Sequence, residues 1–522
     1  MAKGELILSN HWKGATLYQV YPLSFADSNG DGWGDLAGVT ARLDYIKSLS
    51  ADAIWLSPIH QSPMKDWGYD STNWRAIDLR CGNFEDFDDL LCEAHSRDLG
   101  IIVDQVYSYT SDDHPWFTAS RAADNNQYSD WFVWADAKPD GTPPNNWLSI
   151  FGGPAWEWDP RRRQYYMHHF YATMPHLNFH NSDVQAEVLE TADFWLSKGV
   201  DGFRLDVVNL YFHDAALTDN PVSGSVDSRF PGGFQNQIKD RSRPDNLPFL
   251  EKLRGLSEQH GDRLLMAEVT TDDALHLAQI YCAPGRLHTA YVVISDDGLI
   301  NAAKVAKLLG QWDYDQGWPT WSISNHDLPR ALTRCFGAEA PQEAAAVLIA
   351  MLIALRGNIL IYQGDELGLP QALVPIAQRR DGEGVRFGDY GLQRDGARTP
   401  FPWTANQSDL WLPTDAAQKA QAVSQQDGDP TSTLSAARKL LAFRARQSVL
   451  RDGGQYVATE GPILKVIRDL DGVKLTAVLN LSSGSVSADK PAGEIAISGG
   501  CQIQGQSLHL EPYGYCFTLD AQ

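Results

Sequence analysis

Three acidic residues, each at the end of a short apolar run, are the residues of this sequence best suited to catalysis. They are Asp206, Glu268 and Asp327, which close the runs 202–206, 263–268 and 321–327. Each run predicts a buried strand, so the three acids converge on one pocket if the strands are parallel neighbours. Cleavage of a glycosidic bond requires such a set, with one ionised carboxylate as nucleophile and one protonated carboxyl as acid.

The neighbours of these acids make a shared site more plausible than three unrelated charges. A single acid at such a position is more commonly a helix N-cap or a loop charge. Arg204, however, lies two residues before Asp206, and side chains two apart on a strand share a face. Arg204 is therefore expected to hold Asp206 ionised. His326 directly precedes Asp327.

Eight short apolar runs predict the strands that would position the acids. They cover residues 16–21, 53–58, 100–106, 202–207, 263–269, 289–294, 320–324 and 358–362. Helical patterns such as 184–198 and 344–355 lie between most of them. Apolar strands alternating with helices predict an α/β protein with a parallel sheet, and eight such units predict a (β/α)8 TIM barrel with its site at the strand ends. An open doubly wound sheet is the alternative, but no glycine-rich phosphate loop follows the first strand.

Two segments depart from this alternation. Residues 107–178 are too long for a simple loop and rich in Trp, Tyr, Pro and Gly, which predicts an inserted subdomain after strand 3, over the barrel mouth. Residues 454–522 alternate apolar and polar residues between Gly- and Ser-rich turns, which predicts a C-terminal antiparallel β-sandwich domain. The barrel itself is expected from residues 1–106 and 179–453.

Composition excludes several classes of partner. The 522 residues have a net charge of −23, which disfavours nucleic acid and anionic membrane surfaces. A neutral sugar is compatible with this charge. Aromatic residues make up 11% of the chain. Most are expected in the core, and a few are expected to stack on sugar faces in the pocket.

Cysteine usage and the N-terminal residues predict the compartment. The six cysteines are widely spread and form no CxxC motif, so we expect free thiols in a reducing compartment and no zinc or redox site. The first ten residues contain no apolar stretch of signal-peptide length, and no run approaches transmembrane length. We therefore expect a cytoplasmic monomer or homodimer, although a trimmed export signal would leave no trace.

A loop after the first strand has oxygen-bearing residues at alternate positions. Its candidate metal ligands are Asp27, Asn29, Asp31, Trp33 and Asp35. Oxygen ligands with intervening glycines suit a hard cation, so we expect structural Ca²⁺, with Mg²⁺ possible. The loop is not an EF-hand, because no Glu occupies the twelfth position and no flanking helix pair is apparent. An Asx-rich turn without metal is the alternative. No organic cofactor is expected.

A series of motifs in order resembles the α-amylase superfamily of glycoside hydrolases (family 13), in its α-glucosidase and oligo-1,6-glucosidase branch. The resemblance covers essentially the whole chain. Its motifs are Tyr18–Pro22, Asp27–Asp35, Gly68–Asp70, Gly202–Asp206, Ala267–Glu268, Ser324–Asp327, Tyr362–Gly364 and Arg394–Trp403. The segments Trp131–Trp158 and Asn209–Asp214 are most similar to bacterial α-glucosidases with glucosyl-transfer activity.

The resemblance implies roles for the acids and their neighbours. Asp206 would be the nucleophile, Glu268 the general acid/base, and Asp327 a transition-state stabiliser that holds the 2- and 3-hydroxyls. Arg204 and His326 would flank them.

It also implies the residues that bind the terminal glucose. Tyr69 would stack on the sugar, and Phe151 would lie near the pocket rim. Asp70 and Arg398 would pair with each other and hold the 4-hydroxyl, which would close the pocket to all but a chain end.

One departure from the family concerns the sugar itself. Tyr109 replaces a His that usually contacts the 6-hydroxyl of glucose, and Tyr is bulkier and cannot become cationic. Val207, directly after the nucleophile, is more usual in 1,6-active relatives and leaves linkage open.

The resemblance implies a retaining exo-acting α-glucosidase for short α-glucosides (maltose-, sucrose- or isomaltose-like) that also transfers glucose through a covalent glucosyl-Asp206. The alternatives are a trehalose- or sucrose-rearranging enzyme, a hydrolase for a C6-modified α-glycoside, and a silent sugar-binding homologue.

Overall fold

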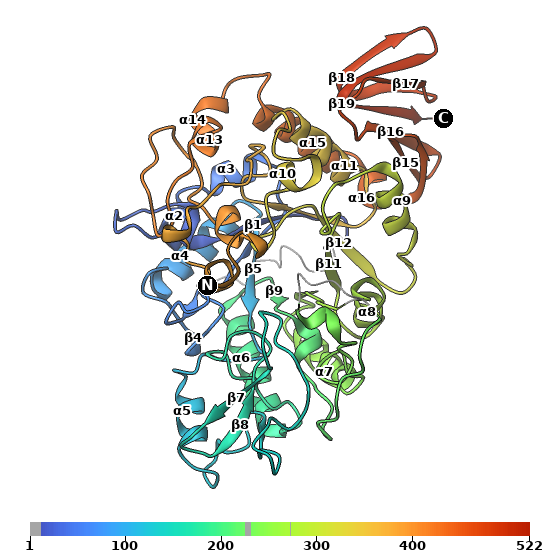
Figure 1. Ribbon diagram of the computed structural model, residues 1–522. Helices are drawn as coiled ribbons and strands as arrows, with labels where there is room; N and C mark the ends of the chain where they lie inside the picture. The colour runs from blue at the N-terminus through green and yellow to red at the C-terminus, as the bar shows by residue number, and fades with distance from the viewer. Residues whose placement is uncertain (1–11, 225–230, 272, 522) are drawn as a thin grey trace.

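Eight parallel strands close into a barrel in the computed structural model, which describes residues 12–224, 231–271 and 273–521 (Figure 1). In order around the barrel the strands are β1 (Thr16–Val20), β13 (Asn358–Tyr362), β12 (Trp318–Ser322), β11 (Thr289–Val293), β10 (Leu264–Ala267), β9 (Gly202–Leu205), β5 (Gly100–Gln105) and β2 (Ala53–Leu56). The eight predicted strands and the (β/α)8 barrel are confirmed, with small differences at strand ends. A closed barrel excludes the open-sheet alternative.

Helices cover the outside of the barrel (Figure 1). The predicted helices 184–198 and 344–355 are confirmed as α6 and α11. The side chain of Asn181 accepts a hydrogen bond from the Asp183 N–H at the start of α6, and Gly199, with a φ of 102°, ends it. The helices are α1 (Pro22–Phe25), α2 (Leu36–Thr40), α3 (Leu43–Ser48), α4 (Phe84–His95), α5 (Pro115–Ala122), α6 (Ser182–Lys198), α7 (Asn246–Gln259), α8 (Ala274–Tyr281), α9 (Ala302–Gly310), α10 (Ala331–Phe336), α11 (Ala344–Ala354), α12 (Gly382–Phe387), α13 (Ala416–Ala420), α14 (Val423–Gln426), α15 (Thr433–Arg446) and α16 (Ser448–Arg451).

The register of the parallel strands brings the candidate residues to one edge of the barrel. Arg204 of β9 is the register partner of Asp104 on β5 and of Met266 on β10. Asp206 and Glu268 each come shortly after these positions, beyond the strand ends. The active sites of (β/α)8 barrels lie at this edge.

A small three-stranded sheet is inserted between β5 and β9, where the sequence predicts a subdomain. It consists of β6 (Trp134–Ala135), β8 (Gln164–Met167) and β7 (Trp156–Asp159) in that order, and the short pair β3 (His60–Gln61) and β4 (Asn73–Ile77) lies outside it. Trp147 and Trp156 stack within its own apolar cluster, with ring centroids 5.8 Å apart. The subdomain bounds 107–178 stay a prediction.

The C-terminal strands form a separate antiparallel sheet, at the opposite end of the molecule from the inserted sheet (Figure 1). Its strands are β14 (Gly454–Glu460), β15 (Ile463–Leu470), β16 (Val473–Asn480), β17 (Val486–Asp489), β18 (Glu494–Gln504) and β19 (Ser507–Ala521). Helix α11 is buried at every position except Ala346, and it contacts α15, β16 and β19. A helix that is apolar all round suits this position between two layers.

Two further sequence predictions concern thiols and membrane segments. All six cysteines are free, and four of them are buried. In the part of the chain that the structure describes, no helix combines the length and apolarity needed to cross a membrane. The first ten residues, on which the signal-peptide prediction rests, lie outside the described residues.

Candidate active site

The three predicted acids line one cavity of about 350 Å³ at the carboxyl ends of the barrel strands. Asp206 follows β9, Glu268 follows β10 and Asp327 follows β12. Tyr69 and Phe151, the first from the loop after β3 and the second from the inserted segment, line the same cavity. The convergence predicted from the strand ends is therefore present.

The guanidinium of Arg204 is the centre of the charged network. Its Nη1 donates to Asp206 Oδ1 at 2.7 Å and to Asp104 Oδ1 at 2.8 Å, and its Nη2 donates to Glu268 Oε2. The Arg204 side chain is fully buried. One cation therefore orients three carboxyl groups, and it holds Asp206 and Glu268 close together on neighbouring nitrogens.

Burial and the cation of Arg204 have opposite effects on the pKa values of the neighbouring carboxyl groups. Removal from water raises the pKa of Asp206, and Arg204 opposes that rise. Burial likewise raises the pKa of Asp104 to about 6, against the lowering effect of Arg204. The raised pKa values of the two buried carboxyl groups, Asp104 and Asp206, favour retention of a proton in the cluster.

Two residues absent from the sequence-based site belong to this network. Asp104, at the end of β5, also accepts hydrogen bonds from Tyr69 Oη at 3.1 Å and Trp55 Nε1 at 3.2 Å. Tyr291 of β11 donates to Glu268 Oε1 at 2.6 Å. The rule that selected Asp206, an acid at the end of an apolar strand, applies equally to Asp104.

Asp327 lies among three nitrogen groups. Burial works against its ionisation, but His326, Arg398 and Arg394 hold the pKa of Asp327 below its ordinary value. The Asp327 Oδ1 accepts from Arg398 Nη2 at 2.6 Å and from Arg394 Nη1 at 3.2 Å. Asp327 therefore presents an anion to the cavity, with 29% of its side chain exposed.

His326 is neutral and fixed in orientation. Burial lowers its pKa to about 3. Gln19 Nε2 donates to His326 Nδ1 at 2.9 Å, which leaves the proton on Nε2, 3.1 Å from Asp327 Oδ2. The ring of Tyr69 stacks on the imidazole at 5.2 Å with an interplanar angle of 4°. Tyr69 is the member of this stack that lines the cavity, and the fully buried His326 supports it from behind.

The predicted pairing of Asp70 with Arg398 is wrong. Asp70 is completely buried and accepts from Ser62 Oγ, Asp66 N and Lys65 N, so it shapes the loop rather than the cavity. Arg398 donates to His326 O and Asp327 instead.

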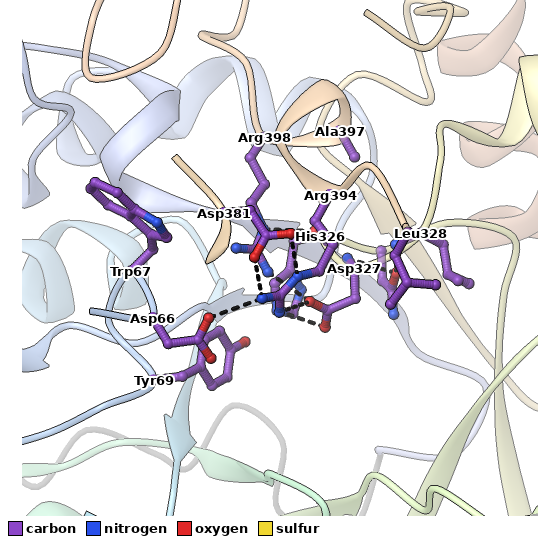
Figure 2. Close-up of polar contacts among 12 residues, drawn as sticks. Asp66, Trp67, Tyr69, His326, Asp327, Leu328, Asp381, Arg394, Ala397 and Arg398 are labelled. Carbon is purple, nitrogen blue, oxygen red and sulfur yellow. Dashed lines mark hydrogen bonds and ion pairs between the residues drawn. The ribbon is translucent and has the colours of Figure 1, made fainter. Parts of the chain in front are cut away.

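The pair that the structure forms is Asp66 with Arg394, at 3.0 Å. Figure 2 shows Arg394 between Asp66, Asp327 and Asp381. Both members of the pair line the cavity. Burial, opposed by Arg394, raises the pKa of Asp66 to about 6. This ion pair lies at the cavity in place of the pair predicted from Asp70 and Arg398.

We expect Asp66→Asn to raise KM for α-glucosides roughly 10- to 100-fold, the cost of losing a hydrogen bond to a charged group. Steady-state kinetics of the purified variant measures this change in KM. Asp70→Asn is the matched comparison: it disturbs three buried contacts, so it should lower the unfolding temperature and change KM less. A larger KM effect at Asp70 than at Asp66 would contradict this assignment.

Tyr109 lies against Asp206. Its hydroxyl donates to Asp206 Oδ2 at 2.8 Å, and its ring packs edge-on against Phe170 at 5.3 Å. Burial raises the pKa of Tyr109, so the hydroxyl stays protonated. Phe151 borders the same region and lies under the guanidinium of Arg394, 4.9 Å from its ring centroid.

Val207, the residue after Asp206, has a strained backbone. Val207 has a φ of 34° and a ψ of 51°, in the left-handed region where a β-branched residue is an outlier. Such a conformation costs on the order of 1–3 kcal/mol. Its N–H donates to Glu268 Oε2 at 3.0 Å. The strained turn thus directs a backbone donor at the carboxyl of Glu268.

The loop 27–35 closes on its own backbone. Asp27 accepts from the N–H groups of Asn29, Gly30 and Gly32, and Asn29 accepts from Asp31. At the end of the loop, Asp31 accepts from the Trp33 N–H, and Asp35 caps α2. Among residues 12–224, 231–271 and 273–521, no three His, Cys, Asp or Glu side chains are grouped to hold a metal. These hydrogen bonds are those of an Asx-rich turn, and the structural cation in this loop stays a prediction.

A (β/α)8 barrel whose strand ends gather a buried Arg and several carboxyl groups defines the class of glycoside-cleaving barrels. Comparison with known proteins makes this specific. Residues 19–453 match the alpha amylase catalytic domain family. The chain belongs to the α-amylase family of glycoside hydrolases.

Individual relatives cover nearly the whole chain. A probable alpha-glucosidase of Rhizobium meliloti (strain 1021) is 42% identical over 92% of this chain and 91% of its own length. An oligo-1,6-glucosidase of Heyndrickxia coagulans is 32% identical over 97% of this chain and 98% of its own length. The crystal structure of the alpha-glucosyl transfer enzyme XgtA has a TM-score of 0.93 at 43% identity, covering 97% of this chain and 99% of that one. A small carbohydrate is the substrate class that these relatives share.

Proposed function

We propose that the protein is a retaining, exo-acting α-glucosidase that hydrolyses short α-glucosides and transfers glucosyl groups. The observation that carries this proposal is the placement of Asp206 and Glu268 on the two nitrogens of one guanidinium. Retaining enzymes need carboxyl groups close enough for direct attack, whereas inverting enzymes leave room for a water molecule between them. The Asp66–Arg394 pair beside them supports recognition of a chain end.

The proposed reaction has two displacements. The carboxylate of Asp206 forms a bond to C1 of the glucose while the bond from C1 to the leaving oxygen breaks, and protonated Glu268 gives its proton to that oxygen. Glu268, now ionised, takes a proton from water or another hydroxyl, whose oxygen bonds to C1 as the bond to Asp206 breaks. Asp327 and His326 stabilise the positively charged sugar ring and its hydroxyls between these states.

The experiment that tests the proposal is hydrolysis of p-nitrophenyl α-glucoside followed by two readouts. Release of p-nitrophenol reports cleavage, and proton NMR of the first sugar formed reports its anomer. We expect α-glucose first, which then equilibrates. β-Glucose as the first product would contradict retention, and no release would contradict glucosidase activity.

A hydrolase for an α-glycoside altered at C6 is the second candidate, favoured by the contact of Tyr109 with Asp206. We expect Tyr109→His to raise kcat/KM for p-nitrophenyl α-glucoside severalfold, because the smaller imidazole leaves more room at the nucleophile. The α-xyloside, which lacks the C6 hydroxymethyl group, should gain nothing. Tyr109→Phe is the control, since it removes only the hydroxyl. An unchanged or lower glucoside rate in Tyr109→His would count against a contact between Tyr109 and the 6-hydroxyl.

Structural Ca²⁺ in the loop 27–35, with Mg²⁺ as the alternative, also stays a proposal. Its support is that an ionised carboxylate has lone pairs beyond those used by backbone N–H groups. If Ca²⁺ binds, adding it after treatment with a chelator should raise the unfolding temperature by a few degrees, and Asp31→Ala should remove the rise. No shift in the wild-type protein would favour the metal-free turn.

The remaining proposals concern the cellular compartment, the oligomeric state and the partners of the enzyme. Free thiols support a reducing compartment, so we propose the cytoplasm. We propose a monomer or homodimer that takes an α-glucoside and hydroxyl acceptors as its partners.

A further inference from the structure

A second cavity, of about 620 Å³, lies among β4, α5 and α6, in the lower half of Figure 1. Helix α6 contacts β4 directly, and Tyr128 and Trp131 of the inserted segment complete the lining. Within the described part of the chain, this cavity and the catalytic cavity share no lining residue. It is also the larger of the two, so it has room for a ligand of the size of a sugar.

Aromatic rings form one side of the second cavity. Trp116 and Tyr128 are both partly exposed, and their rings lie nearly parallel, with centroids 6.5 Å apart and an interplanar angle of 25°. Trp131 packs edge-on against each of them at 4.9 Å, which holds both rings in place. These rings therefore offer flat apolar surface to a ligand in an otherwise polar cavity.

Three buried polar atoms on the lining have no hydrogen-bond partner among the described residues. They are Trp74 Nε1, Arg75 Nε and Thr191 Oγ1. The side chain of Trp74 is 3% exposed, and Thr191 is fully buried. A buried polar group without a partner costs free energy, so an unpaired group in a native protein requires an explanation. The nitrogens of Trp74 and Arg75 only donate, so a ligand that satisfies them must present acceptors.

Carboxylates of helix α6 provide the complementary groups. Glu187 Oε1 accepts from Arg75 Nη2 at 2.7 Å, and Glu190 Oε2 lies 3.5 Å from the same nitrogen. Asp183 lines the cavity as well. A carboxylate has about four acceptor positions, so each of these groups can accept from a ligand after its contact with Arg75.

This combination selects a neutral hydroxylated ligand. An inorganic anion would meet three carboxylates against a single guanidinium. An organic cation would suit the carboxylates and the rings but would leave the N–H groups of Trp74 and Arg75 unpaired. A hydroxyl group both donates and accepts, and a sugar ring adds an apolar face that can lie against Trp116 or Tyr128.

We propose that the second cavity is a binding site for a neutral sugar of one or two rings, separate from the catalytic cavity. The inference does not depend on the proposed glucosidase function, because no residue of the catalytic set takes part in it.

Tryptophan distinguishes binding at this site from binding at the catalytic cavity. Trp74, Trp116 and Trp131 line the second cavity, whereas no Trp of the described chain lines the catalytic one. The wild-type enzyme is labelled with fluorotryptophan and titrated with glucose, and its fluorine NMR signals are assigned with single Trp→Phe variants. We expect the signals of these three residues to shift together along one saturable curve.

Two threonine variants test whether the unpaired hydroxyl takes part in binding. Thr191→Val removes that hydroxyl at nearly unchanged volume and should weaken glucose binding roughly three- to tenfold, the loss of one hydrogen bond. Its unfolding temperature should equal or exceed that of the wild type, because a buried hydroxyl without a partner does not stabilise the fold. Thr518 of β19 is the matched control, since its buried hydroxyl also has no partner among the described residues. Thr518→Val should leave the glucose titration unchanged, and equal titrations of the two variants would overturn the proposed site.

Choline and phosphate are the rival probes, one for an organic cation and the other for an anion. Saturable shifts of the three Trp signals with either ion, and none with glucose, would assign the cavity to an ion and overturn the proposal. No shift with any of the three probes would overturn it too and indicate a cavity filled by water. Both results leave the glucosidase function standing, because release of p-nitrophenol tests that function separately.

Discussion

Asp206→Asn is expected to lower kcat for α-glucosides by at least roughly 10⁴-fold, the size of loss seen when a nucleophile is removed from a catalytic set. The amide of Asn has no negative charge with which to attack C1, and the rest of the site remains. Hydrolysis of p-nitrophenyl α-glucoside measures the loss. Full activity in this variant would refute the assignment of the nucleophile.

Rescue by azide distinguishes loss of the nucleophile from a general loss of active-site structure. In Asp206→Ala, a small anion can enter the space that the carboxylate leaves and attack C1 from the same face. One displacement inverts the anomeric centre, so the product should be β-glucosyl azide, identified by NMR. Recovery of the α-azide would place the missing group on the opposite face of the sugar and contradict the role of Asp206.

The fold of both variants should survive. Removing one partner of a buried ion pair can cost about 3–5 kcal/mol when the other charge is left alone. Arg204 keeps Asp104 and Glu268 as partners, at 2.8 Å in the case of Asp104. A thermal unfolding curve close to that of the wild type is therefore the expected control.

The barrel could be predicted from sequence because its strands are buried on both faces. The runs 16–21 and 358–362 read as nearly continuous apolar segments, and that signal is local. The closure of the strands into a barrel was predicted from the number of strand–helix units, which is eight. The three acids could be found because a position at a strand end fixes the edge of the barrel on which a side chain lies.

The ion pair of Asp66 with Arg394 could not be predicted in the same way. Asp66 and Asp70 lie four residues apart in one irregular loop, where no periodicity says which side chain faces the cavity. Trp67 with a φ of 52° and Gly68 with a φ of 107° set that turn. Backbone N–H groups then bind Asp70 inside the loop, while Asp66 meets Arg394 from a distant segment. Long-range contacts of this kind are decided by tertiary structure.

Glu268→Gln is expected to lower kcat/KM most for substrates whose leaving group must be protonated in order to depart. For an alkyl α-glucoside or a disaccharide, whose leaving oxygen must be protonated, we expect a loss of roughly 10²- to 10⁴-fold, the usual contribution of a general acid. For α-glucosyl fluoride the loss in the first step should be far smaller, because fluoride leaves without a full proton transfer. Measurement of kcat/KM on both substrates gives the comparison.

Azide again reports the face of attack, and here the opposite anomer is expected. In Glu268→Ala, Asp206 still forms the glucosyl ester, and azide then displaces it from the side that Glu268 occupied. Two displacements retain configuration, so α-glucosyl azide should form. Equal losses on the alkyl glucoside and the fluoride, or a β-azide product, would show that Glu268 is not the acid. The pair of azide products, β from the Asp206 variant and α from the Glu268 variant, follows only if the two carboxyl groups act on opposite faces of C1.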